Sequence, residues 1–406
     1  MKTYEQFLRE SAVPRETIDA FLDPETQTWA QFDPEVGYIL YNYMPRDGID
    51  GSSTISTVEA NGARKSAVYA DRPCRINTYG NSFTQCHQVN DPETWQEYLA
   101  GHLGEPIRNF GMGGFGVYQA FRRMLRTEET ADGAEYVILY IWGDDHMRSC
   151  MRCRYVITRP WIWHQGPSMF HGNFWAHVEM DLETGRLVER ESLLPTPESL
   201  YRMADPDFMA EAMGDDLMSQ MYVMLEQHTD HEPMEGFQLD RLNRLAEILG
   251  CDPLTSRNPE EWQKGVRSLR NAYGFAATTY ILDRAAEYAA SKGKKLLVAL
   301  YCPMATRELI EQGTRYDQPV VEHLKNRGSL YFDMNVVHLE DFRCFNLSRE
   351  DYMARYSIGH YSPAGNHFFA YSIKDTIVAW LEPKPITYRN DDARLIDFTG
   401  YLADQG

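Results

Sequence analysis

Short apolar stretches alternate with amphipathic stretches in two separate parts of the chain. In the first part, the pattern predicts in order a strand at 75–79, a helix over about 92–103, a strand at 107–110, a helix over about 117–127 and a strand at 136–142. In the second part, it predicts a helix over about 269–290, a strand at 295–301, more helix, a strand at 329–334 and a helix over about 363–381. Such alternation is typical of a parallel sheet with helices on both faces. We therefore predict an α/β fold, a three-layer α/β/α sandwich around a mostly parallel five-stranded sheet.

Two segments lie outside this alternation and divide the chain. Residues 1–72 contain acid–Pro and Gly turns between short alternating pieces, which predicts a β-rich segment that wraps the core. Residues 151–269 interrupt the core (73–150 and 270–383) with many aromatic residues, a hairpin signal and a helix rich in Met. We expect these Met residues to face the core, the alternative being a surface where a second copy of the chain binds. Residues 384–406 are predicted to form a tail.

The amino-acid composition argues against some classes of binding partner. The 406 residues include 59 Asp and Glu against 40 Lys and Arg, which gives a formal charge of −19. We therefore expect no nucleic-acid partner and no membrane partner, because both present negative charge. No run approaches about 18 consecutive apolar residues, and the first residues lack the apolar core of a secretory signal. Seven scattered cysteines, an odd number, favour reduced thiols and a cytoplasmic protein.

A serine follows the first predicted strand of the core. The loop Gly80-Asn-Ser82-Phe-Thr84 comes directly after the strand at 75–79. A Ser at a strand-to-helix turn has an exposed hydroxyl beside helix N-terminal amides, which stabilise negative charge. The loop differs from the G-x-S-x-G elbow of α/β-hydrolases because Thr84 takes the last position. Ser82 is therefore a candidate nucleophile, the alternative being a simple helix N-cap.

A glycine-rich loop follows the second strand. Its glycines from Gly111 to Gly116 satisfy G-x-G-x-x-G, a dinucleotide-binding pattern. The pattern stands on the second strand instead of the first, however, and the next acid at a strand end, Asp144, comes 28 residues after Gly116. The usual interval is about 20 residues. We predict no cofactor here, and expect the glycines to let backbone amides approach a reacting oxygen.

Two further loops carry titratable side chains. Asp144, Asp145 and His146 follow the strand at 136–142, but their spacing is not distinctive for a metal site. A single C-x-x-C, at 150–153, has no second pair of ligands nearby, so we predict no metal. Near the C-terminus, His360 lies in a loop before the predicted helix start and is a candidate base. His367 falls inside that helix and is interpreted as structural.

Taken in this order, the four loops resemble the sequence blocks of the SGNH (GDSL-like) hydrolase family, over about 73–150 and 270–382. The first loop is similar to a block that usually has Gly-Asp-Ser, and here Asn81 replaces the Asp. The second loop places Gly114 where the family has an oxyanion-hole glycine. In the third, usually ending Asn-Asp, Asp144 stands in place of the Asn. In the last, the family has an Asp three residues before the His, where this chain has Ser357.

The resemblance implies a flavodoxin-like strand arrangement and a Ser–His hydrolase that needs no cofactor. By this resemblance Ser82 attacks an ester carbonyl and forms an acyl-enzyme, while His360 takes up the hydroxyl proton and returns it to the leaving alcohol. The amides of Ser82 and Gly114 and the side chain of Asp144 would form the oxyanion hole. An ionised Asp144 would repel an oxyanion, so only its protonated form could donate.

Other residues are expected to support this chemistry. Asn81 and Asp145 flank the reacting groups in sequence. With no Asp before His360, its imidazole is left to be oriented by a backbone carbonyl, by Ser357 or by a distant acid. Aromatic residues of the interruption are expected to form a platform for a sugar ring, the alternative being a place in the core; these are Trp161, Trp163 and Trp175.

Three functions from different classes stay open. The favoured one is a serine esterase that removes an acyl group from a carbohydrate or another small molecule. The second is an acyltransferase, or an enzyme of altered chemistry in which Asp144 acts as acid and base. The third is a catalytically weak binding protein that uses the same cleft, with the Met-rich helix as an interface between copies of the chain.

Overall fold

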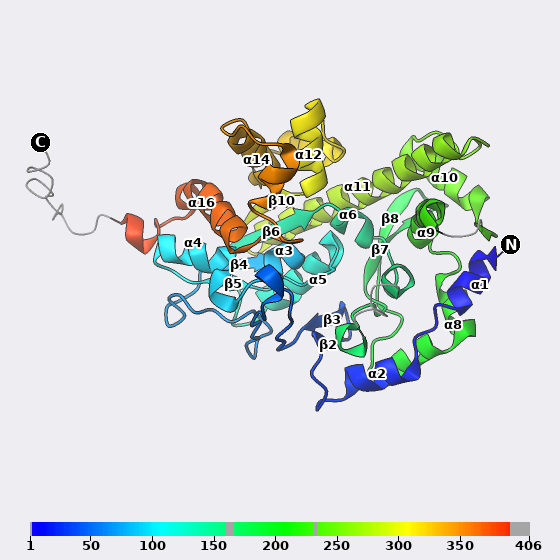
Figure 1. The fold of residues 1–406 in the computed structure, drawn as a ribbon, viewed down its shortest axis with the longest axis horizontal. Coiled ribbons are helices and arrows are strands. Elements are labelled where there is room, and N and C mark those ends of the chain that lie inside the picture. Colours follow the sequence, from blue (N-terminus) through cyan, green and yellow to red (C-terminus); the bar gives the residue numbers. More distant parts are fainter. Residues whose placement is uncertain (1, 160–165, 231–233, 390–406) are drawn as a thin grey trace, which may run out of the picture.

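The computed structural model describes residues 2–159, 166–230 and 234–389, and its centre is a five-stranded parallel sheet (Figure 1). Its strands are β4 (Ile76–Tyr79), β5 (Ile107–Asn109), β6 (Tyr136–Trp142), β10 (Lys295–Tyr301) and β11 (Tyr331–Asp333). They lie in the order β11-β10-β6-β4-β5, and each neighbouring pair is parallel. Numbered along the chain, this order is 2-1-3-4-5, the flavodoxin-like arrangement. The predicted α/β sheet is confirmed, and β6 and β10 have the predicted bounds.

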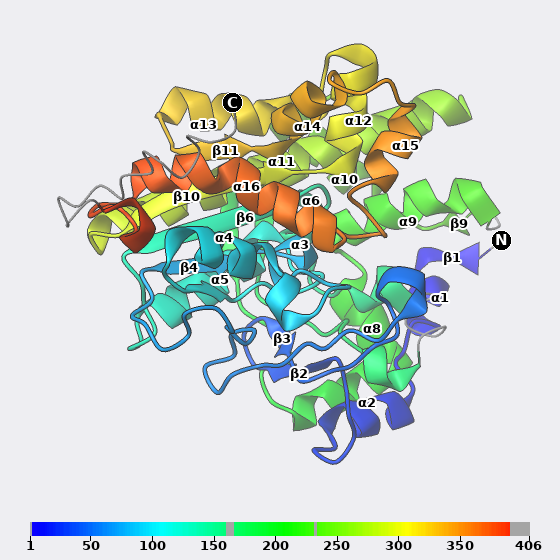
Figure 2. The ribbon, with the colours of Figure 1, turned by 60° about the vertical axis from the view of Figure 1, so that its left-hand side comes forward.

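Helices cover both faces of the sheet, which makes the three predicted layers. On one face lie α4 (Trp95–Leu103) and α16 (Pro363–Trp380), which run side by side across the strands in Figure 2. Their side chains share a buried cluster with β4, β6 and β10. On the other face, α5 (Val117–Glu128), α11 (Pro259–Ser291) and α13 (Gln318–Arg327) bury theirs in a second cluster. Strands covered on both faces are apolar throughout, as the sequence of β6 shows.

Helix α11 joins the sheet to the segment that interrupts the core. It has 33 residues, about 50 Å at 1.5 Å per residue. Its first half, including Leu269 and Tyr273, packs with the interruption, and its second half, including Ile281 and Leu282, packs on the sheet. The helix begins at Pro259, ten residues before the predicted start, with Asn258 as its N-cap. The prediction began late because 259–268 is mostly polar.

The interruption has its own helices and a hairpin. The antiparallel pair β7 (His177–Asp181) and β8 (Arg186–Arg190) forms the predicted hairpin. The helices are α8 (Pro206–Met213), α9 (Leu217–Asp230) and α10 (Leu239–Leu249). The single Met-rich helix that the sequence predicts is divided into α8 and α9. The Met side chains of both are buried, as the core interpretation expects; they are Met209, Met213, Met218, Met221 and Met224.

The N-terminal segment is mixed instead of β-rich, which corrects the prediction. It holds α1 (Tyr4–Arg9), α2 (Arg15–Leu22), the two-residue strand β1 (Lys2–Thr3) paired with β9 (Met234–Glu235), and the hairpin of β2 (Ala30–Asp33) with β3 (Gly37–Leu40). A capping box between Thr3 and Gln6 starts α1. The pattern T-x-x-Q was readable in the sequence, but both helices are shorter than the window over which helical periodicity is visible.

Short helices complete the core. These are α3 (Ser82–Gln85), α6 (Asp145–Arg148), α12 (Pro303–Gln312), α14 (Met334–Phe342) and α15 (Arg349–Ala354). Helices α3 and α6 begin directly beyond the carboxyl ends of β4 and β6. Within the described ranges, no helix combines the length and the apolar character that crossing a membrane requires.

Candidate active site

Ser82 lies at the point of the sheet where the strand order reverses. It is the first residue of α3, directly after β4, and β4 pairs with both β5 and β6. In sheets of this kind, ligands bind in the crevice outside the strand ends at this reversal. Asn81 caps α3, since its side-chain oxygen accepts a 2.7 Å bond from the amide of Phe83. Gly80 has φ 154°, and a Cβ there would clash with Thr84 and with the carbonyl of Tyr140, so the turn needs glycine.

The hydroxyl of Ser82 contacts the imidazole of His360. Ser82 Oγ lies 2.8 Å from His360 Nε2, although the two residues are 278 positions apart. His360 stands in a tight loop before α16, closed by an isolated bridge between Ser357 and Tyr361. Ser357 Oγ accepts a 3.3 Å bond from the amide of Gly359. Ser357 therefore shapes the loop, and the imidazole is oriented by a different residue.

That residue is Gln88, which sequence reasoning missed. Gln88 Oε1 accepts bonds from the backbone amide of His360 at 2.8 Å and from its Nδ1 at 2.9 Å. Gln88 Nε2 donates to the carbonyl of Asp47 at 2.9 Å. A backbone N–H is always a donor, so the atom of Gln88 that faces it is the oxygen, and Nδ1 must carry the proton. Nε2 is then unprotonated and accepts the hydroxyl proton of Ser82.

The backbone around Gln88 is strained into this position. Cys86 and Gln88 both have left-handed backbone, with φ 59° and 72°. Residues other than glycine seldom adopt it, and such strain concentrates at functional sites. The turn brings Gln88 back towards His360 directly after α3 ends. No motif in the sequence marks this residue, because its role depends on a backbone turn and on a loop 272 residues away.

Burial favours the neutral form of His360. Burial lowers its pKa to about 3, with a smaller contribution from the neighbouring His87 and an opposing one from Asp47. Gln88, the partner of Nδ1, is uncharged and does not raise this pKa. The ring is therefore a neutral base over the whole physiological range.

The low pKa of His360 predicts an unusual pH dependence of catalysis. We expect kcat/KM to stay level from about pH 8 to about pH 5, because the active neutral imidazole persists, whereas a His of pKa about 6.5 would lose about 30-fold at pH 5. Steady-state kinetics on an activated acetyl ester would measure this. Buried His146 and His338 also have lowered pKa values, about 4 and about 3. Their protonation favours the unfolded chain as the pH falls below about 6.5, so circular dichroism must accompany the assay. An acid limb near pH 6.5 in folded enzyme would contradict the expectation.

Two backbone amides beside Ser82 are free to stabilise an oxyanion. Gly114, in the loop after β5, lines the same cavity as Ser82 and has φ 83°. In the described part of the chain, neither the amide of Ser82 nor that of Gly114 donates a hydrogen bond to protein. The other glycines of the loop contact the protein itself: a Cβ at Gly111 would clash with the backbone of α3, and one at Gly113 would lie 2.7 Å from Trp29. These two glycines are therefore packed closely against neighbouring segments of the protein.

In the third loop, after β6, Asp145 is hydrogen-bonded to the loop of Ser82, whereas the neighbouring Asp144 is not. Asp145 is buried, and its carboxylate accepts bonds from the side chain of Asn81, from the amide of Trp142 at 2.8 Å and from Arg148 at 3.1 Å. Burial raises the pKa of Asp145 to about 7, while Arg148 and the other donors oppose this shift. Asn81 and Asp145 therefore tie the loop of Ser82 to the end of β6.

Asp144 does not take the expected place in the oxyanion hole. Its side chain is 44% exposed and lies 3.8 Å from Arg148, outside the residues that line the cavity. It is the residue before α6, and its side chain does not cap that helix. His146 is buried against Thr278, 2.9 Å from its hydroxyl. Among the described residues, no group of three or more His, Cys, Asp or Glu is arranged to hold a metal.

A cavity of about 390 Å³ opens onto Ser82 and His360. This volume is within the range of small-molecule sites. Its walls come from several distant segments: Trp29 from the N-terminal hairpin region, His87 after α3, Trp142 at the end of β6, and Met169 and His171 from the interruption. Arg148 and Arg154 also line it. The cavity therefore combines apolar walls with basic groups.

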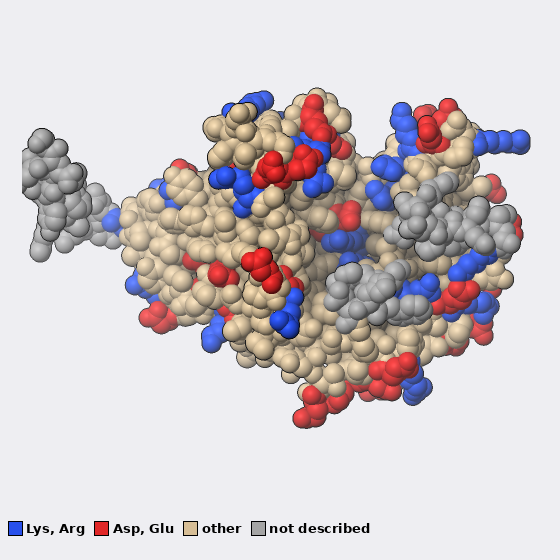
Figure 3. Space-filling view, in the orientation of Figure 1, with Lys and Arg blue, Asp and Glu red and all other residues tan. Residues whose placement is uncertain are grey.

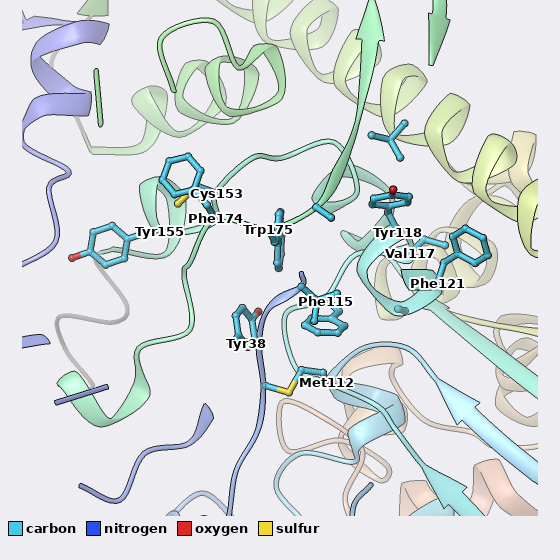
Figure 4. Packing of buried hydrophobic residues seen from close by; sticks show 14 of the residues in the cluster. Tyr38, Met112, Phe115, Val117, Tyr118, Phe121, Cys153, Tyr155, Phe174 and Trp175 are labelled. Carbon is cyan, nitrogen blue, oxygen red and sulfur yellow. The ribbon is translucent and has the colours of Figure 1, made fainter. Parts of the chain in front are cut away.

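The expected aromatic platform is not formed as predicted. Trp175 is fully buried, its ring stacks on Tyr38, and its indole N–H donates to the carbonyl of Met151. Figure 4 shows it among Tyr38, Phe115 and other core side chains. An indole covered on all sides offers no face to a sugar, so the structure assigns Trp175 to the core. Trp161 and Trp163 lie outside the described residues. Trp29 and Trp142, which the sequence did not single out for this role, line the cavity instead.

Comparisons with known proteins find solved structures of low similarity. No protein-family model matches the sequence, and no curated protein matches it. It is similar to the solved structure of a member of the lipolytic protein G-D-S-L family from Veillonella parvula DSM 2008, with 12% identity, 75% of this chain and 97% of that chain covered, and a TM-score of 0.35. It is also similar to a lipolytic protein of the G-D-S-L family from Desulfitobacterium hafniense DCB-2, with 11% identity, 74% and 98% covered, and a TM-score of 0.32.

Proposed function

We propose that the protein is a serine-dependent ester hydrolase that works through an acyl-enzyme. The observation that supports this is the hydrogen-bonded series Ser82–His360–Gln88. The hydroxyl of Ser82 lies 2.8 Å from Nε2 of His360, and the side-chain oxygen of Gln88 accepts a hydrogen bond from Nδ1. A serine hydroxyl becomes a useful nucleophile only beside a base, and a base works best when a third group fixes its tautomer. Cysteine proteases with an Asn in the third position show that a neutral amide can serve.

The steps follow from the positions of these groups. Ser82 Oγ attacks the ester carbonyl while Nε2 of His360 accepts its proton. The negative charge that develops on the carbonyl oxygen is stabilised by the amides of Ser82 and Gly114. When the intermediate collapses, the imidazolium returns the proton to the leaving alkoxide. A water molecule then gives its proton to the same Nε2 and attacks the acyl carbonyl. When this second intermediate collapses, the imidazolium returns the proton to Ser82 Oγ and the acid is released.

The cavity supports a small substrate. Its volume of about 390 Å³ admits a short acyl group and a compact alcohol. Trp142, half-buried at the end of β6 with Phe83 and Arg148 against its ring, and the buried Trp29 form apolar parts of its wall. We propose an acyl ester of a carbohydrate or of another small molecule as the substrate class.

A covalent probe tests this proposal directly. We expect a fluorophosphonate to label the folded protein once, at Ser82, because the probe reacts only with a serine activated by a base and an oxyanion hole. Intact-mass and peptide mass spectrometry would show the site. The matched control is Ser82→Ala, which must remain unlabelled. Folded protein that takes up no probe and cleaves no short-chain 4-nitrophenyl ester would overturn the proposal.

A further inference from the structure

Arg154 lies against the glycine of the oxyanion hole. A Cβ at Gly114 would clash with Nη1 of Arg154, so the guanidinium packs directly over this residue. The same Nη1 donates to Tyr38 Oη at 3.2 Å, and Tyr38 Oη donates to the carbonyl of Gly113 at 3.2 Å. Gly114 therefore leaves the space that the arginine fills, and Tyr38 fixes its direction. The charge lies at the wall of the cavity that contains Ser82.

The two arginines of the cavity differ in their partners. Arg148 faces two acids, Asp145 at 3.1 Å and Asp144 at 3.8 Å. Within the described ranges, the guanidinium of Arg154 donates its side-chain hydrogen bond to the neutral phenol of Tyr38, and no carboxylate lies at ion-pair distance from it. A guanidinium has five N–H donors, so most of those on Arg154 are left for another partner. Arg148 is close enough to disfavour the charge on Arg154 further.

A half-buried arginine without a counter-ion is costly, and a ligand that supplies the anion relieves this cost. The chain as a whole carries a formal charge of −19, so a basic cavity stands out against its surroundings. Figure 3 shows Lys or Arg atoms inside a hollow beside α6, with Asp or Glu atoms near them. A cation without a carboxylate partner in such a hollow attracts anions locally in spite of the net charge.

We infer that the substrate ester carries a carboxylate, which Arg154 binds at the wall of the cavity beside Gly114. This inference rests on the proposed function, because the position of Arg154 is described relative to the reacting serine. A carboxylate matches the planar fork of a guanidinium and accepts two parallel hydrogen bonds. The residue is then a specificity determinant: it selects acidic esters over neutral esters of the same size.

Two matched pairs of esters test the inference from both sides of the scissile bond. On the alcohol side, 4-acetoxybenzoate is compared with methyl 4-acetoxybenzoate. On the acyl side, the mono-4-nitrophenyl ester of adipic acid is compared with 4-nitrophenyl hexanoate. We expect the native protein to prefer the acid in at least one pair, by about 10- to 100-fold in kcat/KM. In Arg154→Gln this ratio should fall to near one, and Arg154→Lys should keep part of it.

The control variant is Arg267→Gln, at an exposed position of α11 away from the cavity, which should keep the native ratio. Thermal unfolding of each variant shows whether it is folded, and Arg154→Lys keeps the test usable if the glutamine variant is not. An equal fall of kcat/KM for acid and neutral esters in Arg154→Gln would overturn the inference, because it would make Arg154 an oxyanion donor. The absence of any preference in the native protein would overturn it as well.

A binding measurement separates this inference from the proposed function. Calorimetry with Ser82→Ala, which cannot turn over, is expected to show binding of 4-acetoxybenzoate and none of its methyl ester, and the signal should vanish when Arg154→Gln is added. This result supports the anion site even if no ester is cleaved. If the protein cleaves esters but shows no preference for the acid over the neutral ester in binding or kinetics, the proposed hydrolase function is supported and the anion site is overturned.

Discussion

Alanine at position 82 or at position 360 is expected to lower kcat for a short-chain ester by about 10⁵-fold, and the double variant should be no worse than either single one. The reason is that the hydroxyl and the imidazole act as one unit. Without the base, Ser82 keeps its proton, and without the nucleophile, His360 has nothing to activate but water. The two losses therefore do not add. Steady-state kinetics with 4-nitrophenyl acetate on the three variants would measure them.

The matched control is His367→Ala, an exposed histidine seven positions after His360, on α16. Its ring contacts Tyr98 and His102 and lies away from the cavity. We expect this variant to keep native kcat. Losses in Ser82→Ala and His360→Ala that multiply in the double variant would show that the two residues act independently. In that case the acyl-enzyme proposal would fail.

Replacement of Gln88 by Ala is expected to lower kcat by about 10²- to 10⁴-fold. The oxygen of Gln88 is what places the proton on Nδ1 of His360, and its loss frees the ring to take the wrong tautomer or to turn. KM should change little, because Gln88 is not among the residues that line the cavity. The kinetics of Gln88→Ala, with Gln312→Ala on the surface of α12 as the control, would measure this effect.

Gln88→Glu separates orientation from charge. A carboxylate in the same place still accepts from Nδ1 and in addition stabilises the imidazolium, so the pKa of His360 should rise towards the ordinary range. The acid limb of kcat/KM should therefore move to higher pH than in the native enzyme. The variant also loses the donor to the carbonyl of Asp47, which should lower its melting temperature. An unchanged pH profile in folded Gln88→Glu would show that Gln88 does not govern the titration of His360.

The sheet was predictable because its signal is local. A strand that helices cover on both faces must be apolar along its whole length, and β6 and β10 stand out in the sequence for this reason. The topology then places every strand end at one edge, so the loops of Ser82 and Gly114 had to lie near each other. The sequence also marked His360 by its position before a helix start, although it could not show the contact of 2.8 Å.

Errors arose where a residue's role depends on its surroundings. Trp175 is a residue type that often binds sugar rings, but here it is enclosed by core side chains. Asp144 stands in the sequence where an oxyanion donor is expected, but it is not among the residues that line the cavity. The two N-terminal helices have 6 and 8 residues and take their stability from packing, so periodicity over a longer window missed them.

The amino-acid sequence by itself determined the parallel sheet and its two helical layers, since buried strands and helix starts each leave a local pattern. It proposed Ser82 and His360 as a pair only through the resemblance of their loops to the SGNH blocks. Only the tertiary structure decided which residue orients His360 and which residues line the cavity. Gln88 is defined by a left-handed turn and by the backbone amide of a loop 272 residues away, and Arg154 by the space left over Gly114. Contacts between segments so far apart depend on how the whole chain packs, and no short stretch of sequence records them.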